Sequence, residues 1–342
     1  MPPIYDRQSD SPVLAVTMGD VNGVGPEILA KAMARPEVRD RCRIVVFGDA
    51  GVYARASEQG AGAPEAHPCT SLEEALACRQ AIPFFDAGVP APGLRPGELD
   101  PEAGKAAAEW VVSAARAALA GQVDGLVTCP INKACIRAAG YDYFGHTDLI
   151  AELTGSHDYR MCLFTERMRI VHVTAHCALR QAIERLSVER IVNSVRAGYD
   201  ALLRLGITPP RIAVAGLNPH AGEGGVFGRE ELDIIAPAVA ACCADGVACS
   251  GPYPPDTVFR RMHAGEFDMV IAMYHDQGHI ALKLIAMEKG VNVTLGIPIV
   301  RTSVDHGTAY DIAWRNMAEE TSLCAAIDFA ARLAAQPGRN TA

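Results

Sequence analysis

The sequence predicts an α/β protein built around parallel sheets, and three features point to this class. Seven short apolar runs, rich in β-branched residues, recur along the 342-residue chain. Near-continuous apolarity over about five residues is typical of strands that are covered on both faces. The segments between these runs are long enough to be helices, and such alternation favours β–α units over separate all-α and all-β parts.

The expected elements follow in chain order. The strands are expected at residues 13–18, 43–47, 124–128, 169–174, 211–215, 268–273 and 291–295. An alanine-rich stretch with helical spacing predicts a helix over residues 103–120. Ser187 is expected to cap a second helix that continues until Gly206. Residues 60–91 are rich in Gly, Pro and Ala, which indicates a variable surface excursion.

The composition excludes several classes of protein. The formal net charge of −9 offers no basic field for nucleic acid or acidic membranes, although a few local cations can still hold a small anion. No apolar run is long enough to span a bilayer, and residues 1–12 lack a secretory pattern. The eleven scattered cysteines contain no C-x-x-C pair and are expected to be buried thiols in a reducing cytosol. We therefore expect a cytoplasmic enzyme.

Polar residues gather directly after the carboxyl ends of the expected strands. They are Gly19 and Asp20, residues 130–133, His176, residues 218–220, and the pair His275 and Asp276. In open α/β sheets, ligands bind beyond the carboxyl ends of the strands. The pattern therefore predicts one binding site at this edge.

Three of these loops each carry one histidine: His176, His220 and His275. A single histidine at such a place is more often a structural residue, but three in equivalent loops favour a shared divalent metal with open positions for substrate. Nitrogen ligands prefer Zn²⁺, Co²⁺ or Mn²⁺ to Mg²⁺. Asp256 and Asp276 can add an oxygen ligand or orient a histidine, although Asp256 also suits a helix start.

A second set of residues suits an anion. It comprises His146, Thr147, Lys283, Asn292 and Arg301. Arginine and lysine bind phosphate, and hydroxyl and amide groups complete its shell, although each cation taken alone is more often solvated. The glycine-rich stretch 19–27 also suits an anion at a helix start, but it is not a G-x-G-x-x-G fingerprint. A dinucleotide is permitted by these residues and not demonstrated by them. His172 is expected in the core, and His279 has no independent claim to the site.

Longer motifs connect these residues to one family. The stretches are 17–20, 23–27, 145–147, 174–180, 216–223, 255–257, 273–278 and 301–308, which read TMGD, GVGPE, GHT, TAHCALR, GLNPHAGE, PDT, MYHDQG and RTSVDHGT. Together they resemble the 4-hydroxythreonine-4-phosphate dehydrogenase (PdxA) family over nearly the whole chain. One departure is Val21 with Asn22, where the family usually has Pro-Ala.

The resemblance implies a fold like that of isocitrate and isopropylmalate dehydrogenases, with two α/β/α subdomains, an active site in the cleft between them and a homodimer with that site at its interface. Approximate subdomains are residues 1–145 with 303–342, and residues 146–302. The family's metal histidines fall on His176, His220 and His275. Its substrate contacts fall on His146, Thr147, Lys283, Asn292 and Arg301, while Asp256 and Asp276 match positions near the site.

The activity implied by the resemblance is NAD-dependent, metal-dependent oxidation and decarboxylation of a 4-phosphorylated 3-hydroxy acid. Lys133 is a candidate general base, although a lysine at a helix start is more often structural. Residues 278–283 look more like the branch acting on D-threonate or D-erythronate 4-phosphate than like the branch acting on 4-hydroxythreonine 4-phosphate. A cis-dihydrodiol carboxylate dehydrogenase of the same family, or a non-redox metal-dependent sugar-phosphate enzyme, is the alternative.

Overall fold

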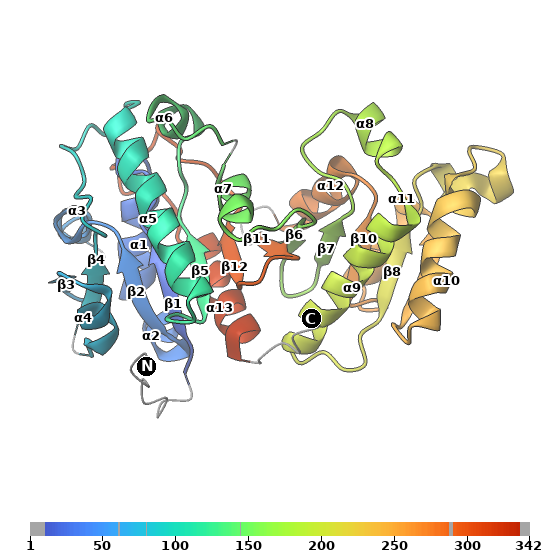
Figure 1. Ribbon diagram of the computed structural model, residues 1–342, viewed down its shortest axis with the longest axis horizontal. Helices are drawn as coiled ribbons and strands as arrows, with labels where there is room; N and C mark the ends of the chain where they lie inside the picture. The colour runs from blue at the N-terminus through green and yellow to red at the C-terminus, as the bar shows by residue number, and fades with distance from the viewer. Residues whose placement is uncertain (1–10, 61, 80, 144, 287–289, 336–342) are drawn as a thin grey trace. The chain divides into compact units, whose positions relative to one another are not determined.

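The chain folds into two compact α/β units, shown in Figure 1. The computed structural model describes residues 11–60, 62–79, 81–143, 145–286 and 290–335. The first unit contains the described residues up to His157 and those from Pro298 onward, and the second contains Asp158–Ile297. The predicted α/β class is confirmed, because strands and helices alternate along both units.

The first unit has an entirely parallel sheet in the order β3-β4-β2-β1-β5-β12. Its strands are β1 (Val13–Thr17), β2 (Arg43–Phe47), β3 (Ala66–Cys69), β4 (Ile82–Phe85), β5 (Gly125–Thr128) and β12 (Arg301–Val304). Because the strands are parallel, the loops after Thr17 and Thr128 leave the sheet at the same edge. β1 and β5 are almost completely buried, which explains their apolar sequences.

Helices α5 and α13 pack against β1 and β5 of this sheet (Figure 1). The helices of the unit are α1 (Gly25–Ala34), α2 (Pro36–Arg41), α3 (Ala50–Ser57), α4 (Leu72–Ala77), α5 (Pro101–Leu119), α6 (Lys133–Ala138), α7 (His146–Leu153) and α13 (Thr321–Ala335). Asp100 caps α5 by accepting from the Glu102 N–H, and Pro101 fits its first turn. The alanines of α5 allow a close approach to the sheet.

The second unit has a mixed sheet in the order β11-β6-β7-β10-β8-β9. Its strands are β6 (Arg160–Phe164), β7 (Arg169–His172), β8 (Ile212–Ala215), β9 (Cys249–Tyr253), β10 (Met269–Ala272) and β11 (Val291–Leu295). β11 and β7 run antiparallel to β6, whereas β7, β10, β8 and β9 are mutually parallel. The carboxyl ends of β7, β10 and β8 therefore share one edge.

Helices α9, α11 and α12 pack against β10 and its neighbours (Figure 1). The helices of this unit are α8 (Leu179–Glu184), α9 (Val188–Arg204), α10 (Ala236–Ala244), α11 (Pro255–His263) and α12 (His275–Ala286), with short turns over Pro219–Gly225 and Glu231–Ile235. Ser187 caps α9 through its hydroxyl, which accepts from the Arg190 N–H. This cap confirms the predicted start of that helix.

All seven strands expected from apolar runs are present, but the expectation for residues 60–91 was wrong. That stretch contains β3, α4 and β4 rather than a surface excursion. β3 was missed because its sequence, AHPC, is short, contains a proline and shows no apolar run. As the outermost strand of its sheet it pairs only with β4, and an edge strand tolerates such residues.

The first unit includes α7, which packs against α5, and so extends to His157. It also includes β12, which begins at Arg301 and pairs with β5. Within the described residues, no helix combines the length and apolarity that crossing a bilayer requires. Of the eleven cysteines, all with free thiols, six are buried as expected.

Asn22, the departure in the first loop, has a structural role. The side chain is fully buried; its Oδ1 accepts from the Arg95 N–H at 2.8 Å, and its carbonyl accepts from Gly97 at 2.8 Å. Asp20, two residues before Asn22, accepts a hydrogen bond from the Tyr310 hydroxyl at 2.6 Å. The loop after β1 is thus fixed by hydrogen bonds on both sides.

Candidate active site

Two side chains tie together the loops that follow β7, β8 and β10. The buried Thr174 hydroxyl donates to the Met273 carbonyl at 2.8 Å. Gln277 accepts from the Met273 N–H through Oε1 (2.7 Å) and donates to the Gly216 carbonyl through Nε2 (2.8 Å). The three loops that carry the predicted metal histidines are therefore braced against one another. The apolar patterns gave no signal for this bracing.

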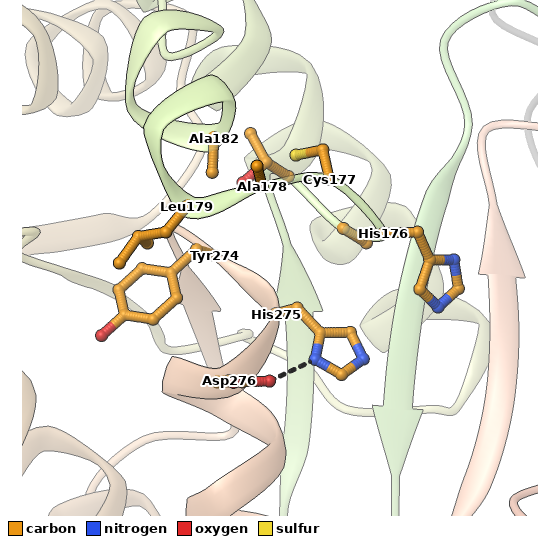
Figure 2. A pocket seen from close by; sticks show the side chains of 10 residues that line it. His176, Cys177, Ala178, Leu179, Ala182, Tyr274, His275 and Asp276 are labelled. Atoms are coloured by element: carbon orange, nitrogen blue, oxygen red, sulfur yellow. Dashed lines mark hydrogen bonds and ion pairs between the residues drawn. The ribbon is translucent and has the colours of Figure 1, made fainter.

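His275 is the first residue of α12, and its ring lies beside that of His176 (Figure 2). The ring centroids are 5.5 Å apart. Nδ1 of His275 is 2.7 Å from Oδ1 of Asp276, and this hydrogen bond lowers the pKa of the Asp276 carboxyl. Because the ionised carboxylate can only accept, Nδ1 carries the proton and Nε2 keeps its lone pair. Asp276 thus holds His275 in the tautomer that a metal ligand needs.

A pocket of about 450 Å³ opens beside these two histidines (Figure 2). It is lined by residues 174–179, Ala182, Tyr274, His275 and Asp276. A second pocket of about 440 Å³ lies between α11 and α12 and is lined by Asp256 as well as Asp276. Asp256 is exposed in the first turn of α11, so the expected helix start is confirmed there, whereas Asp276 borders both pockets.

His220 lies in a loop with unusual backbone geometry. Five consecutive residues, from His220 to Gly224, have φ values between 43° and 79°. His176 also has a positive φ, of 47°. Side chains other than glycine pay a steric cost in this left-handed region, and such residues concentrate at functional sites. Two of the three predicted metal histidines are therefore held in backbone conformations that the sequence alone would not favour.

Buried Glu231 holds the His220 loop in this conformation. Its Oε1 accepts from the N–H groups of Leu217 and Asn218, both at 2.8 Å, and its Oε2 accepts from the Asn218 amide at 2.9 Å. Burial raises the pKa of Glu231, but these hydrogen bonds outweigh burial and the pKa is lowered. A Cβ at Gly222 would lie 2.7 Å from Oε2, so this position requires glycine. Sequence patterns did not reveal Glu231, because a buried acid looks like a surface acid.

A pair of buried histidines lies directly beneath His275. The His279 ring stacks on the His275 ring at 3.6 Å and 12°, and its Nδ1 is 3.2 Å from Nε2 of His172. Nδ1 of His172 is 3.0 Å from the Met161 carbonyl, so Nδ1 donates there and Nε2 accepts from His279. A Cβ at Gly278 would come within 2.5 Å of His172. His172 is in the core as expected, but it also supports the site.

This buried pair predicts acid sensitivity of the chelator-treated protein. Burial lowers the pKa of His172 to about 3, and burial together with His275 lowers that of His279 to about 4. Unfolded histidine titrates near pH 6.5, so between about 6.5 and 4 the unfolded chain binds more protons. The free energy of unfolding therefore falls as the pH drops through that window and is unaffected by this pair above it.

Urea unfolding at about pH 7 and about pH 5 measures the effect. His279→Leu should lose less stability between the two values than the unsubstituted protein, because one titrating group is gone. His157→Gln, at an exposed position, is the matched control and should retain the full loss. An equal loss in all three proteins would contradict the role of the pair.

Arg301 is the centre of the candidate anion site in the first unit. Its guanidinium is 2% exposed and donates to the Thr128 hydroxyl at 2.9 Å and the Thr147 hydroxyl at 3.4 Å. Burial lowers its pKa to about 10, so it stays charged at neutral pH while having lost hydration. A phosphate beside it would offset this cost by charge-assisted hydrogen bonds.

His146, at the start of α7, adjoins Arg301 in the same unit. Its Nε2 is buried and has no hydrogen-bond partner among the described residues, while the ring bonds the Cys129 carbonyl. Burial and the Arg301 charge lower the pKa of His146 well below its ordinary value. The ring is therefore neutral, and Nε2 is an acceptor that suits a hydroxyl group of a ligand. Lys133 is the exposed first residue of α6. Its Cε lies 3.8 Å from the place that a Cβ at Gly145 would take, so its side chain packs beside the residue that precedes His146.

The two remaining anion candidates belong to the second unit. Lys283 is exposed on α12, one helical turn after His279. Its charge contributes to the lowered pKa of His279. Asn292 lies on β11, and its Oδ1 is buried without a hydrogen-bond partner in the described part of the chain. A buried oxygen of this kind can accept a hydrogen bond from a donor group of a bound ligand.

The donor set of the second unit fits a divalent metal in part. His176 and His275 adjoin each other, and His275 has the required tautomer. The three predicted histidines do not form a group whose ligand atoms all lie within 4.8 Å of one another. In the described residues that condition is met by His67, Cys69 and Glu74 of the first unit.

Known proteins resemble this chain along almost its whole length. The profile of the family "Pyridoxal phosphate biosynthetic protein PdxA" matches residues 40–330. A 4-hydroxythreonine-4-phosphate dehydrogenase from Desulfosudis oleivorans is 47% identical over 97% of this chain and 98% of its own. A D-threonate 4-phosphate dehydrogenase from Pectobacterium atrosepticum is 42% identical over 95% and 100%. The crystal structure of 4-hydroxythreonine-4-phosphate dehydrogenase from Klebsiella pneumoniae matches with a TM-score of 0.84, 44% identity and coverage of 96% and 100%.

Fold, site and relatives together define an α/β dehydrogenase, an enzyme that acts on a CH–OH group. Each unit carries its own cluster beside the carboxyl ends of parallel strands, where such folds bind ligands: histidines in the second unit and a buried arginine in the first. The chain belongs to the PdxA family.

Proposed function

We propose that this protein is an NAD-dependent, divalent-metal-dependent dehydrogenase that oxidises and decarboxylates a small 4-phosphorylated 3-hydroxy acid. The favoured substrates are D-threonate and D-erythronate 4-phosphate, with 4-hydroxythreonine 4-phosphate as the close alternative. Relatives named for D-threonate 4-phosphate and for 4-hydroxythreonine 4-phosphate match this chain over almost its full length. The buried Arg301 charge in the candidate anion site disfavours a nearby ammonium group and so favours a hydroxy acid without one.

The buried guanidinium of Arg301 is the observation that carries this proposal. A charged side chain that is 2% exposed and bonded to threonine hydroxyls has lost its water, and a dianionic phosphate restores the lost interaction. Anchoring at the phosphate leaves the far end of a four-carbon acid for the reaction. Fixing both ends lowers the entropic cost of orienting the reacting carbon.

His146 and Lys133 suit the hydroxyl groups of such a substrate. Neutral His146 can accept, through Nε2, a hydrogen bond from a neighbouring substrate hydroxyl that does not react, and so orient the substrate. Lys133, at the start of α6, is the proposed base that takes the hydroxyl proton as the carbonyl forms. Bound NAD would serve as the hydride acceptor, and His176, His220 and His275 would hold a divalent ion that would supply Lewis-acid chemistry for the oxidation and for loss of CO₂.

Asp276 has a positioning role in this proposal. It holds the proton on Nδ1 of His275, so that Nε2 is available to the ion. Asp256 lines the neighbouring pocket between α11 and α12, and it remains a candidate for contact with substrate or cofactor there.

The protein is further proposed to be a homodimer. Helix α12 carries three exposed apolar side chains, Ile280, Leu284 and Ile285, of which Leu284 is 85% exposed. Apolar side chains grouped on one helix are typical of a surface that another subunit covers. Sedimentation at micromolar protein should give the mass of a dimer, and a monomer mass would remove this part of the proposal.

A direct assay tests the function. Metal-loaded protein is mixed with NAD and, separately, with 4-hydroxythreonine 4-phosphate, D-threonate 4-phosphate and D-erythronate 4-phosphate. NADH absorbance should grow with at least one of them, and one CO₂ should be released per NADH. We expect the largest kcat/KM for D-threonate or D-erythronate 4-phosphate. No NADH with any of the three, or with a cis-dihydrodiol carboxylate, would indicate the alternative of a non-redox enzyme on a phosphorylated sugar acid.

A further inference from the structure

Three residues at the outer edge of the first unit form a second cluster of metal-binding groups. His67 and Cys69 lie on β3, and Glu74 lies on α4. A ring nitrogen of His67, the Cys69 sulfur and a Glu74 oxygen all lie within 4.8 Å of one another. We propose that these residues bind a Zn²⁺-class divalent ion, at a site that is independent of the histidines of the second unit and that clamps β3 to α4.

Local structure brings the three groups together. His67 and Cys69 are two residues apart on a strand, so their side chains leave the same face. The chain then turns, and Ser71 caps α4 by accepting from the Glu74 N–H at 3.1 Å. This cap places Glu74 one turn into the helix, with its Oε1 4.0 Å from Nε2 of His67. The ligand atoms of a tetrahedral ion lie closer together than this, so ion binding would draw the three side chains inward.

Glu74 is held ready as an oxygen ligand. Its Oε2 accepts from the backbone N–H of Thr70 at 2.7 Å and from the Thr70 hydroxyl at 2.9 Å. These hydrogen bonds fix the carboxylate and lower its pKa, so Glu74 is ionised at neutral pH. Because Oε2 makes both bonds, Oε1 remains on the side of His67.

Cys69 supplies the ligand that selects the metal. Its side chain is 6% exposed, and its thiol donates to the His67 carbonyl at 3.4 Å. Burial, with the charges of Glu74 and Cys78, raises the pKa of Cys69 to about 11, so the thiol keeps its proton until a cation replaces it. Sulfur and imidazole nitrogen suit Zn²⁺ and Co²⁺, whereas Mg²⁺ and Ca²⁺ prefer oxygen.

Binding therefore exchanges one proton for one ion. As the sulfur–metal bond forms, the Sγ–H bond breaks and the proton passes to the buffer, while His67 binds as neutral imidazole and Glu74 as carboxylate. The affinity should consequently rise with pH. Water, or the thiol of Cys78 one helical turn beyond Glu74, completes the four-coordinate ion.

Such an ion would stabilise a weak part of the fold. β3 is the outermost strand of its sheet, has four residues and pairs only with β4. α4 has six residues, too few to be stable without tertiary contacts. An ion that binds only the folded arrangement raises the unfolding temperature, and the rise grows with the logarithm of the free ion concentration above its Kd.

Cobalt absorption tests the site on the full-length protein. A thiolate bound to Co²⁺ gives a sulfur-to-metal charge-transfer band in the near ultraviolet, whereas the ligands proposed in the second unit, His176, His220 and His275, contain no sulfur. The band should be present in the unsubstituted protein, saturate at one equivalent in His220→Ala, where the second-unit site is disabled, and disappear in Cys69→Ser. His67→Gln, at an exposed position, should keep the fold and weaken Co²⁺ binding about tenfold or more.

The outcomes separate this site from other thiols and from the proposed enzyme activity. Cys324→Ser should leave the band unchanged, and Cys78→Ser alters it only if that thiol is the fourth ligand. Zn²⁺ should raise the unfolding temperature of His220→Ala and not that of the double variant His220→Ala with Cys69→Ser. No band in the unsubstituted protein, or an equal band in Cys69→Ser, would overturn the proposal, whatever the NADH assay shows.

Discussion

His220→Ala is expected to remove the divalent ion of the second unit and to lower kcat/KM by more than about 100-fold while the fold persists. Deleting one of three nitrogen ligands leaves a site that binds the ion too weakly to fill at micromolar metal. His220 is exposed in a loop, so its removal opens no cavity in the core. Metal analysis after dialysis, together with circular dichroism, measures both parts of this prediction.

A second substitution at His220 is needed, because the positive φ of this residue can itself destabilise an alanine variant. Its φ of 54° is costly for alanine, whereas asparagine tolerates this region. His220→Asn therefore removes the imidazole while keeping the loop, and it should lose the ion as His220→Ala does. His157→Ala, at an exposed histidine, should keep ion and activity. Full occupancy in His220→Asn would show that the ligand assignment is wrong.

Arg301→Ala is expected to raise the KM for the phosphorylated substrate by roughly 10- to 100-fold with a smaller change in kcat, because charge-assisted hydrogen bonds to phosphate contribute about 1.5–3 kcal/mol each. The phosphate does not react, so its loss weakens binding in the ground state and the transition state alike. Steady-state kinetics with each substrate measures the split between KM and kcat.

Two further variants separate anion binding from packing. Arg301→Lys keeps the charge and loses the planar fork, so its KM should fall between those of the unsubstituted protein and Arg301→Ala. Inorganic phosphate should inhibit the unsubstituted protein and inhibit Arg301→Ala much less. Arg116→Ala, at an exposed position on α5, is the matched control. An unchanged KM in a folded Arg301→Ala protein would mean that the anion binds elsewhere.

Seven strands could be predicted because each is a short apolar run, whereas β4, β6 and β12 were not predicted although they are largely buried. β1, β2 and β10 are short runs with at most one partly exposed residue, and such runs are visible without any knowledge of neighbours. β3 and β9 were missed for the opposite reason. They are outer strands, so sheet pairing rather than burial decides their conformation.

The positions of His176, His220 and His275 were predicted for a related reason. Parallel strands end at one edge, so a polar residue after each buried strand is placed there by topology alone. The supports of those histidines were not predicted. Glu231 lies eleven residues beyond His220, and Gln277 reaches the loop after β8, so each acts through a contact between distant segments.

The sequence by itself determined the α/β class, the family and the strand-end positions of the site residues, because apolar runs and long motifs are local properties of the chain. Only the tertiary structure decided which side chains are buried, which of them are charged, and which are fixed by hydrogen bonds. It packed neutral His172 and His279 beneath His275, buried the Arg301 charge against two threonines and brought His67, Cys69 and Glu74 together. Burial and proximity set protonation and ligand geometry, and both arise from contacts that the order of residues does not record.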